Sequence, residues 1–113
     1  MKWLFVSLLV SSLAFAGDKK KEEAKPDPAA VAAGARLYLE KTCVACHGKD
    51  AKTPIMPDYP RLAGQSAAYA EKQMLDIKSG ARANGNTAAM KGVMPLVSEA
   101  EIKNLAAYLS SLQ

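Results

Sequence analysis

The chain has 113 residues, of which 50% are hydrophobic and 23% are charged, with a formal net charge of +4. A charge this mild does not indicate a nucleic-acid-binding protein, whose signature is a strongly basic face. The chain has only two cysteines and one histidine, too few to supply four soft ligands to a structural zinc ion. Its sequence also lacks a glycine-rich phosphate loop and a nucleophile with a spare histidine, which argues against common enzyme classes.

Residues 1–16 have the features of a secretory signal peptide. Lys2 precedes an apolar run, and the sequence AFA at 14–16 is a small-x-small cleavage pattern. We therefore expect cleavage after Ala16 and export to the periplasm. An uncleaved anchor is disfavoured because the apolar run is shorter than the ~20 residues of a spanning helix, so we expect no stable membrane insertion after cleavage.

Residues 17–28 read GDKKKEEAKPDP and predict a charged, flexible linker, because the segment has little apolar surface to bury. The remaining residues, 29–113, show no internal repeat and predict one domain. A domain of this size is near the lower limit at which one hydrophobic core is stable by itself. A buried cofactor would therefore supply much of the core.

Three segments show helical signals, and none shows the alternation of a strand, so the predicted fold class is all-α. Residues 29–40 are rich in alanine and leucine and follow Pro28, which suits a helix N-terminus. Gly34 lies in the middle of this helix, where glycine is unfavourable unless another element packs closely against it.

The second and third predicted helices have clear caps. Ser66 is a typical N-cap for the second helix, which Gly80 ends. The last helix begins with a capping box from Ser98 to Glu101. Its apolar stripe consists of Ile102, Leu105, Leu109 and Leu112.

The segment 53–65 lies between the first two helices and contains three prolines, which exclude a regular helix. We expect an extended loop here. Because it follows the only histidine of the chain closely, this loop is placed to wrap one side of a site built around that residue.

Cys43, Cys46 and His47 form the pattern Cys-x-x-Cys-His, which is typical of covalent haem attachment. The two thiols can each add to one vinyl group of a haem, and the imidazole that follows can bind the iron from one face. A redox dithiol is the alternative, but the sequence lacks the Val/Ile-rich strands of the scaffold that such proteins use. We therefore predict one covalent haem c with His47 as an axial ligand.

The second axial ligand decides the chemistry, because methionine sulfur creates an electron-transfer site while an open position permits ligand binding. Met56 follows His47 too closely to reach the opposite face of the ring. Met74 lies on the packed stripe of the second helix, where a space-filling role is expected. Met90 and Met94 remain, both in the loop before the last helix.

Several separated motifs occur in the order seen in one family. They are Gly34-x-x-Leu37-Tyr38, CVACHG at 43–48, YPRLAGQ at 59–65, the segment 69–80, and Met90-Lys91-Gly92 ahead of a helix ending LAAYLSSL. Together they resemble the class I cytochromes c, in particular the cytochrome c553 group and each half of the dihaem cytochromes c4. The resemblance covers residues 29–113.

This resemblance implies a small class I cytochrome c fold, with three main helices and loops around one haem. It implies that Met90 binds the iron, with Met94 as the alternative ligand and otherwise a wall of the distal pocket. The carbonyl of Pro60 would accept a hydrogen bond from His47, and Leu62 would press on the ring on the same side.

The resemblance also explains Gly34. This glycine and Tyr38 of the first helix would cross the last helix near Leu105 and Tyr108, so the missing side chain would permit a close approach.

The expected function is that of a periplasmic monohaem carrier, not an enzyme, which passes single electrons between a donor and an acceptor protein as a monomer. The alternative is a haem-bearing subunit of a fixed oxidoreductase complex, of the flavocytochrome or sulfur-compound dehydrogenase type. Absence of a methionine ligand would instead indicate a haem enzyme or sensor. A weakly basic docking rim is a further hypothesis, formed by Lys41, Lys49, Lys52, Arg82 and Lys91.

Overall fold

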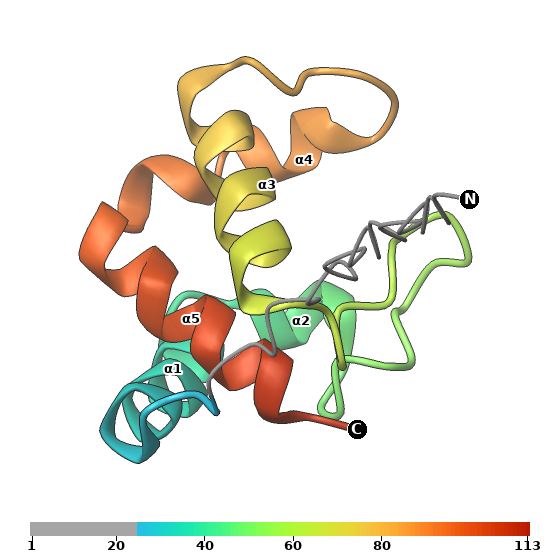
Figure 1. Ribbon diagram of the computed structural model, residues 1–113. Coiled ribbons are helices and arrows are strands. Elements are labelled where there is room, and N and C mark those ends of the chain that lie inside the picture. The colour runs from blue at the N-terminus through green and yellow to red at the C-terminus, as the bar shows by residue number, and fades with distance from the viewer. Residues whose placement is uncertain (1–24) are drawn as a thin grey trace, which may run out of the picture.

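The computed structural model describes residues 25–113 (Figure 1). The predicted signal peptide and most of the predicted linker lie outside these residues. The elements are α1 (Pro28–Glu40), α2 (Cys43–His47), α3 (Ala67–Ser79), α4 (Thr87–Lys91), the 3₁₀ helix η1 (Met94–Leu96) and α5 (Glu99–Ser111). The described residues contain no β-strand, so the all-α prediction is confirmed.

Local capping sets the ends of α1 and α3. Helix α1 begins at Pro28, one residue before the predicted start, because the Asp27 side chain accepts a hydrogen bond from the N–H of Ala29 at 3.2 Å. Ser66 Oγ caps α3 by accepting from the N–H of Tyr69 at 3.1 Å. Gly80 ends α3 at φ 89°, a left-handed conformation that glycine adopts without strain.

Helix α5 begins with the predicted capping box. Ser98 Oγ accepts from the N–H of Glu101 at 3.2 Å, and Glu101 Oε1 accepts from the N–H of Ser98 at 3.0 Å. The bond from the Ser98 N–H stabilises the carboxylate and thereby lowers the pKa of Glu101 below its ordinary value. Two backbone donors that would otherwise lack a helical partner are thus satisfied.

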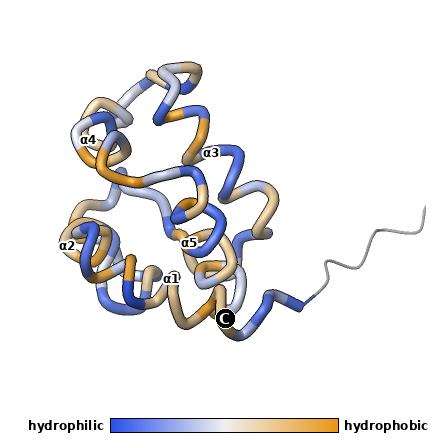
Figure 2. Tube along the Cα trace, turned by 90° about the vertical axis from the view of Figure 1, so that its left-hand side faces the viewer, coloured by the Kyte–Doolittle hydropathy of each residue, from blue (hydrophilic) through white to orange (hydrophobic). Residues whose placement is uncertain are grey.

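The core forms where α5 packs against both α1 and α3 (Figure 1). Ile102, Leu105 and Leu109 of the predicted stripe are buried, while Leu112 is only partly buried at the C-cap. Figure 2 shows hydrophobic and polar positions alternating along the three long helices, as expected when one side of each helix faces the core.

The crossing of α1 and α5 depends on Gly34. A Cβ atom at this position would lie 2.6 Å from the Cβ of Tyr108 and would also clash with the backbone carbonyl of Asn104. One turn further along α1, the ring of Tyr38 packs against that of Tyr108 with 5.6 Å between centroids. The predicted crossing of these two helices is therefore present.

Between α3 and α5 the structure differs from the expectation of a plain loop. This stretch contains α4 and η1, which carry Met90 and Met94 respectively. Neither element has a side-chain cap, and both are too short for an apolar periodicity to be visible in the sequence. The loop 53–65, in contrast, contains no regular helix, as predicted from its prolines.

We predict that Gly34→Ala lowers the free energy of unfolding by about 1–3 kcal/mol, because the added methyl group forces α1 and α5 apart. Gly92→Ala is the matched control. Gly92 has helical dihedral angles, and the nearest atom to an added Cβ is the Ala89 carbonyl oxygen at 3.7 Å. The free energy of unfolding of the Gly92→Ala variant should therefore be unchanged or slightly raised. Urea unfolding of both variants measures the difference, and equal stabilities would contradict the close-packing argument.

Candidate haem site

The chain turns sharply on both sides of α2. Thr42 precedes the helix at φ 66°, and Gly48 follows it at φ 82° with its N–H donating to the Val44 carbonyl at 3.1 Å. A Cβ at Gly48 would also clash with the backbone carbonyl of Thr53. These two turns present Cys43, Cys46 and His47 from a single short helix.

Helix α1 braces this segment through Tyr38. The buried Tyr38 hydroxyl donates a hydrogen bond to the Gly48 carbonyl at 2.5 Å. Burial raises the pKa of Tyr38, so the phenol keeps its proton and remains a donor at physiological pH. The position of α2 is therefore linked directly to the α1–α5 crossing.

The His47 imidazole is 6% exposed, and its Nδ1 lies 3.2 Å from the carbonyl oxygen of Pro60 in the loop 53–65. With Nδ1–H donating to this carbonyl, Nε2 is left with a free lone pair. Burial lowers the pKa of His47, and the bond to Pro60 opposes this shift only in part. A neutral, oriented imidazole is the form that binds a metal.

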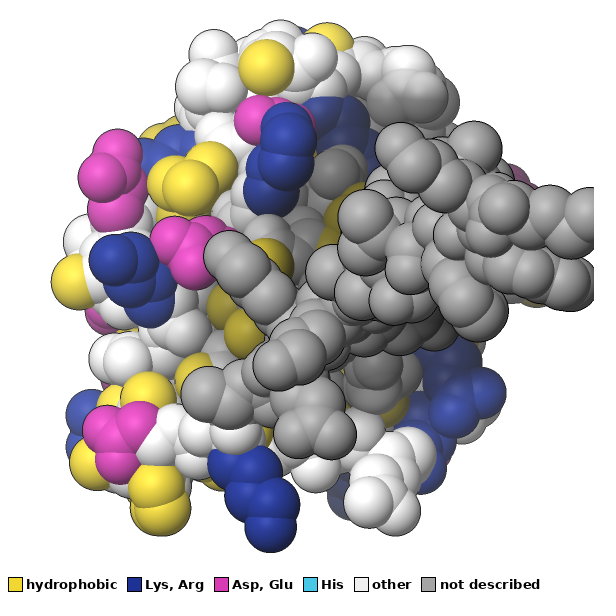
Figure 3. All heavy atoms as spheres, in the orientation of Figure 1, with side chains coloured by type: hydrophobic (Ala, Val, Ile, Leu, Met, Phe, Trp, Pro, Cys, Tyr) yellow, Lys and Arg dark blue, Asp and Glu magenta, His cyan; other side chains and the backbone are white. Residues whose placement is uncertain are grey.

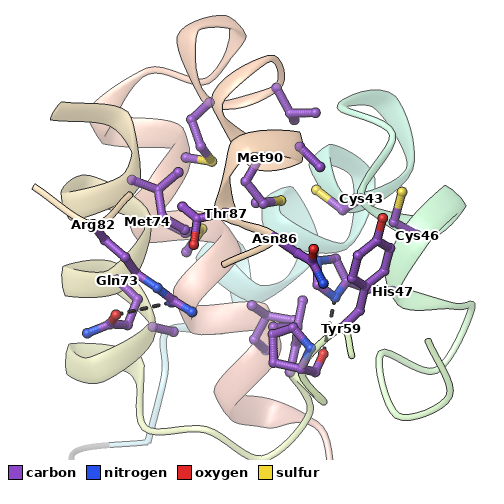
Figure 4. A pocket seen from close by; sticks show the side chains of 18 of the residues that line it. Cys43, Cys46, His47, Tyr59, Gln73, Met74, Arg82, Asn86, Thr87 and Met90 are labelled. Carbon is purple, nitrogen blue, oxygen red and sulfur yellow. Dashed lines mark hydrogen bonds between the residues drawn. The ribbon is translucent and has the colours of Figure 1, made fainter. Parts of the chain in front are cut away.

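A cavity of about 500 Å³ opens beside these residues (Figure 4). Cys43, Cys46 and His47 line one side of it. Most of the remaining wall is apolar and comes from the loop 53–65, α3, α4, η1 and α5. These apolar lining residues include Leu62, Ala70, Met74, Ile77, Met90, Val93, Met94, Leu105 and Leu109.

Three methionines line this cavity, and they differ in burial. Met94 is only 2% exposed and belongs to the packed core. Met90 is half-buried and points from α4 into the cavity, where it lies between Met74 and Cys43 in the view of Figure 4, whereas Met74 enters from α3. Met56 is 45% exposed and lies outside the cavity wall.

A polar group of side chains lines the part of the cavity furthest from the cysteines, and the sequence did not reveal it. Arg82 Nη1 donates to Gln73 Oε1 at 3.1 Å, and both side chains lie across the cavity from Cys43 and Cys46 (Figure 4). The buried Thr87 and the side chain of Asn86 line the cavity as well. An arginine shortly after a glycine cap looks like a surface residue in the sequence, and only the tertiary fold turns it inward.

The predicted basic rim is smaller than expected. Arg82 lines the cavity, and Lys41 donates to the Leu96 carbonyl at 2.9 Å and pairs with Glu101 at 3.7 Å. Lys49, Lys52 and Lys91 remain exposed. Figure 3 shows acidic and basic side chains spread over the same visible face of the described residues, without segregation of one sign.

The alternatives to haem do not fit this site. Burial raises the pKa of Cys43, whereas the attacking thiol of a dithiol exchanger has a lowered pKa. No group of three His, Cys, Asp or Glu side chains within residues 25–113 is placed to hold a metal ion directly. A haem fits, because two free thiols and an imidazole line one side of an apolar cavity, and Arg82 can neutralise haem carboxylates on the other side.

The fold and the site define a small all-α domain that binds one covalent haem c at its Cys43-x-x-Cys46-His47 motif. The family model described as Cytochrome c matches residues 31–113, and the chain belongs to this family. Its members carry electrons and are not enzymes. Across residues 25–113, none of the helices has both the length and the apolar character needed to cross a membrane.

The domain is similar to several characterised cytochromes. Cytochrome c-554(548) from Halomonas halodenitrificans is 44% identical over 70 residues, covering 62% of this chain and 83% of that protein. Cytochrome c4 from Pseudomonas aeruginosa is 39% identical over 104 residues, which are 92% of this chain and 47% of that one. The crystal structure of reduced recombinant cytochrome c4 from Pseudomonas stutzeri superposes with a TM-score of 0.69 at 33% identity, covering 78% of this chain and 50% of that one. The chain thus spans about half the length of these c4 relatives.

We predict that Arg82→Gln lowers the reduction potential by on the order of tens of millivolts, because a unit positive charge near the iron disfavours the ferric state. Arg36→Gln is the matched control, since Arg36 is exposed on α1 and pairs with the neighbouring Glu40 at 3.6 Å, away from the cavity wall. Spectroelectrochemical titration of both holoproteins measures the shift. Equal potentials in the two variants would show that the Arg82 charge is not felt at the iron.

Proposed function

We propose that this protein carries single electrons between redox proteins, with its iron held between His47 and Met90. The observation that supports this proposal is the placement of Met90, whose half-buried side chain points into the cavity that His47 also lines. Met94 is a weaker candidate, because protein atoms already enclose its side chain almost completely. Bound haem supplies one reversible electron, and no vacant coordination position remains when both ligands are in place.

The surrounding residues suit this role. The carbonyl of Pro60 fixes the orientation of the His47 ring, and Leu62 would press on the face of the ring system on this side. The apolar walls exclude water and disfavour the extra charge of the ferric state, which raises the potential. A site held by helices on three sides should change little between oxidation states, which favours fast electron exchange.

The edge of the site near Cys46 is the proposed place of exchange with partners. The backbone N–H of Ile55 donates to the Cys46 carbonyl at 3.0 Å, which places this loop residue directly beside the attachment motif. Ile55 is 66% exposed and the adjacent Met56 is 45% exposed. Two exposed apolar side chains here would let a partner protein approach closely and exclude water from the contact.

Met90→Leu and Met94→Leu form a matched pair for testing the ligand, because each removes one sulfur at nearly constant volume. We predict that ferric Met90→Leu loses the weak far-red sulfur-to-iron band completely and that the ferrous form binds carbon monoxide. Met94→Leu should retain the band, refuse carbon monoxide and lose less than about 1.5 kcal/mol of stability. Absorption spectra and carbon monoxide titrations of the holoproteins measure these properties.

The reverse pattern would assign the ligand to Met94. Wild-type protein that lacks the band and binds carbon monoxide rapidly would refute methionine ligation, and with it the carrier proposal.

The proposed location is the periplasm, on the basis of the N-terminal sequence pattern. We predict that protein purified from an exporting host competent in cytochrome maturation begins at Gly17 and carries the added mass of one haem. Intact-mass spectrometry of the periplasmic fraction measures both properties. Retention of Met1 in the haem-loaded protein would contradict cleavage after Ala16.

A further inference from the structure

Two lysines from distant parts of the chain donate hydrogen bonds to the same short backbone segment. Lys78, in the last turn of α3, donates from Nζ to the Met94 carbonyl at 3.2 Å and to the Val97 carbonyl. Lys41, just after α1, donates from Nζ to the Leu96 carbonyl at 2.9 Å. The segment 94–97, which comprises η1 and the residue after it, is therefore held from two sides.

These carbonyls need such donors. Met94 and Val97 are only 2% and 1% exposed, so both ends of the segment pack in the core, whereas Leu96 is 66% exposed. The single turn of η1 satisfies the Met94 carbonyl by one bond, from the Val97 N–H at 3.1 Å, and α5 begins too late to supply more. An ammonium group binds carbonyl oxygens that have an unused lone pair well, because the bond is charge-assisted.

The position of this segment determines the position of Met90. The Val93 N–H donates to the Met90 carbonyl, and the Leu96 N–H donates to the Val93 carbonyl, each at 3.0 Å. Residues 90–97 therefore form an unbroken series of turns. A displacement of the lysine-held end would move α4 and the sulfur-bearing side chain with it.

The geometry points to Lys78, assisted by Lys41, as a positioning residue for the axial methionine. By tying the Met94 and Val97 carbonyls to α3, Lys78 keeps α4 closed over the cavity and keeps the sulfur of Met90 within bonding distance of the iron. This inference rests on the proposed ligation by Met90. Neither lysine touches the reacting atoms, and both act through the backbone.

Lys78→Met removes the donor while retaining an apolar stem of similar length. We expect the far-red band of the ferric variant to be lost at a lower temperature than in the wild type, before the helical signal in circular dichroism is lost. We also expect the ferrous variant to bind carbon monoxide at least about tenfold faster, the size expected for losing charge-assisted bonds that hold the segment closed.

Lys72→Met is the matched control. Lys72 lies on the same helix and is exposed, and its Nζ pairs with Asp76 at 2.7 Å, away from the segment 94–97. The substitution is chemically identical, and an exposed pair contributes little to stability. Lys78→Arg is the rescue variant, because a guanidinium also offers several donors to the two carbonyls; it should restore slow carbon monoxide binding.

The outcomes separate this inference from the proposed function. Wild-type protein without the far-red band refutes Met90 ligation itself. If the wild type has the band and Lys78→Met behaves like Lys72→Met, the positioning role is wrong. It is also wrong if the band and the helical signal of Lys78→Met are lost together, since that result indicates only a global loss of stability. Should Lys78→Met fail to fold, Lys41→Met provides the same comparison with one anchoring bond removed, and an unchanged rate would overturn the inference.

Discussion

The structure depends on a constraint of volume, because its helices and the loop 53–65 surround a cavity of about 500 Å³ beside the small packed core of the domain. Without a ligand, the mostly apolar wall of this cavity would stay in contact with water, and a domain of this size has little other apolar surface to bury in compensation. A covalently held haem resolves this conflict, since it fills the cavity with an apolar ring that cannot dissociate. Folding of this protein and binding of its cofactor are therefore coupled.

The loops around the cavity are held by a repeated type of interaction, in which a side chain donates to a backbone carbonyl of a distant loop. Tyr38 holds the end of the attachment motif, His47 contacts Pro60, and Lys78 holds the end of η1. Each bond joins a helical residue to a loop or to a single short turn, where the backbone makes few regular hydrogen bonds. The long helices thereby position the loops and short turns that surround the site, as is common in proteins.

The same arrangement explains why the site suits electron transfer. The imidazole orientation is set by the loop on one side, and the methionine side is set by α4 and η1, which are anchored to α3. Because the two sides are fixed independently, the structure should change little when the site gains or loses an electron. The charged side chains that line the cavity are few, namely Asp58, Arg61 and Arg82.

Features that depend on strong signals between neighbours along the chain could be predicted from the amino-acid sequence. The attachment motif at 43–47, the caps at Ser66, Gly80 and Ser98, and the irregular course of the proline-rich loop are local, because a few adjacent residues supply both partners of each interaction. Gly34 could be interpreted only in part from the sequence. Its place in the middle of a helix indicated a loss of helix stability, and only the resemblance to a known family suggested that a close helix crossing requires glycine there.

Features whose partners are far apart in the chain could be recognised only once the chain was folded. Helices α4 and η1 are too short to show a periodicity and are held by contacts with α3. The roles of Lys41 and Lys78 could not be recognised, because a charged residue near a helix end looks the same whether it faces water or a backbone carbonyl 16 or more positions away. Arg82 likewise looks the same whether it faces water or the cavity wall. The difference in burial between Met90 and Met94 likewise arises from packing, which no local pattern of residues encodes.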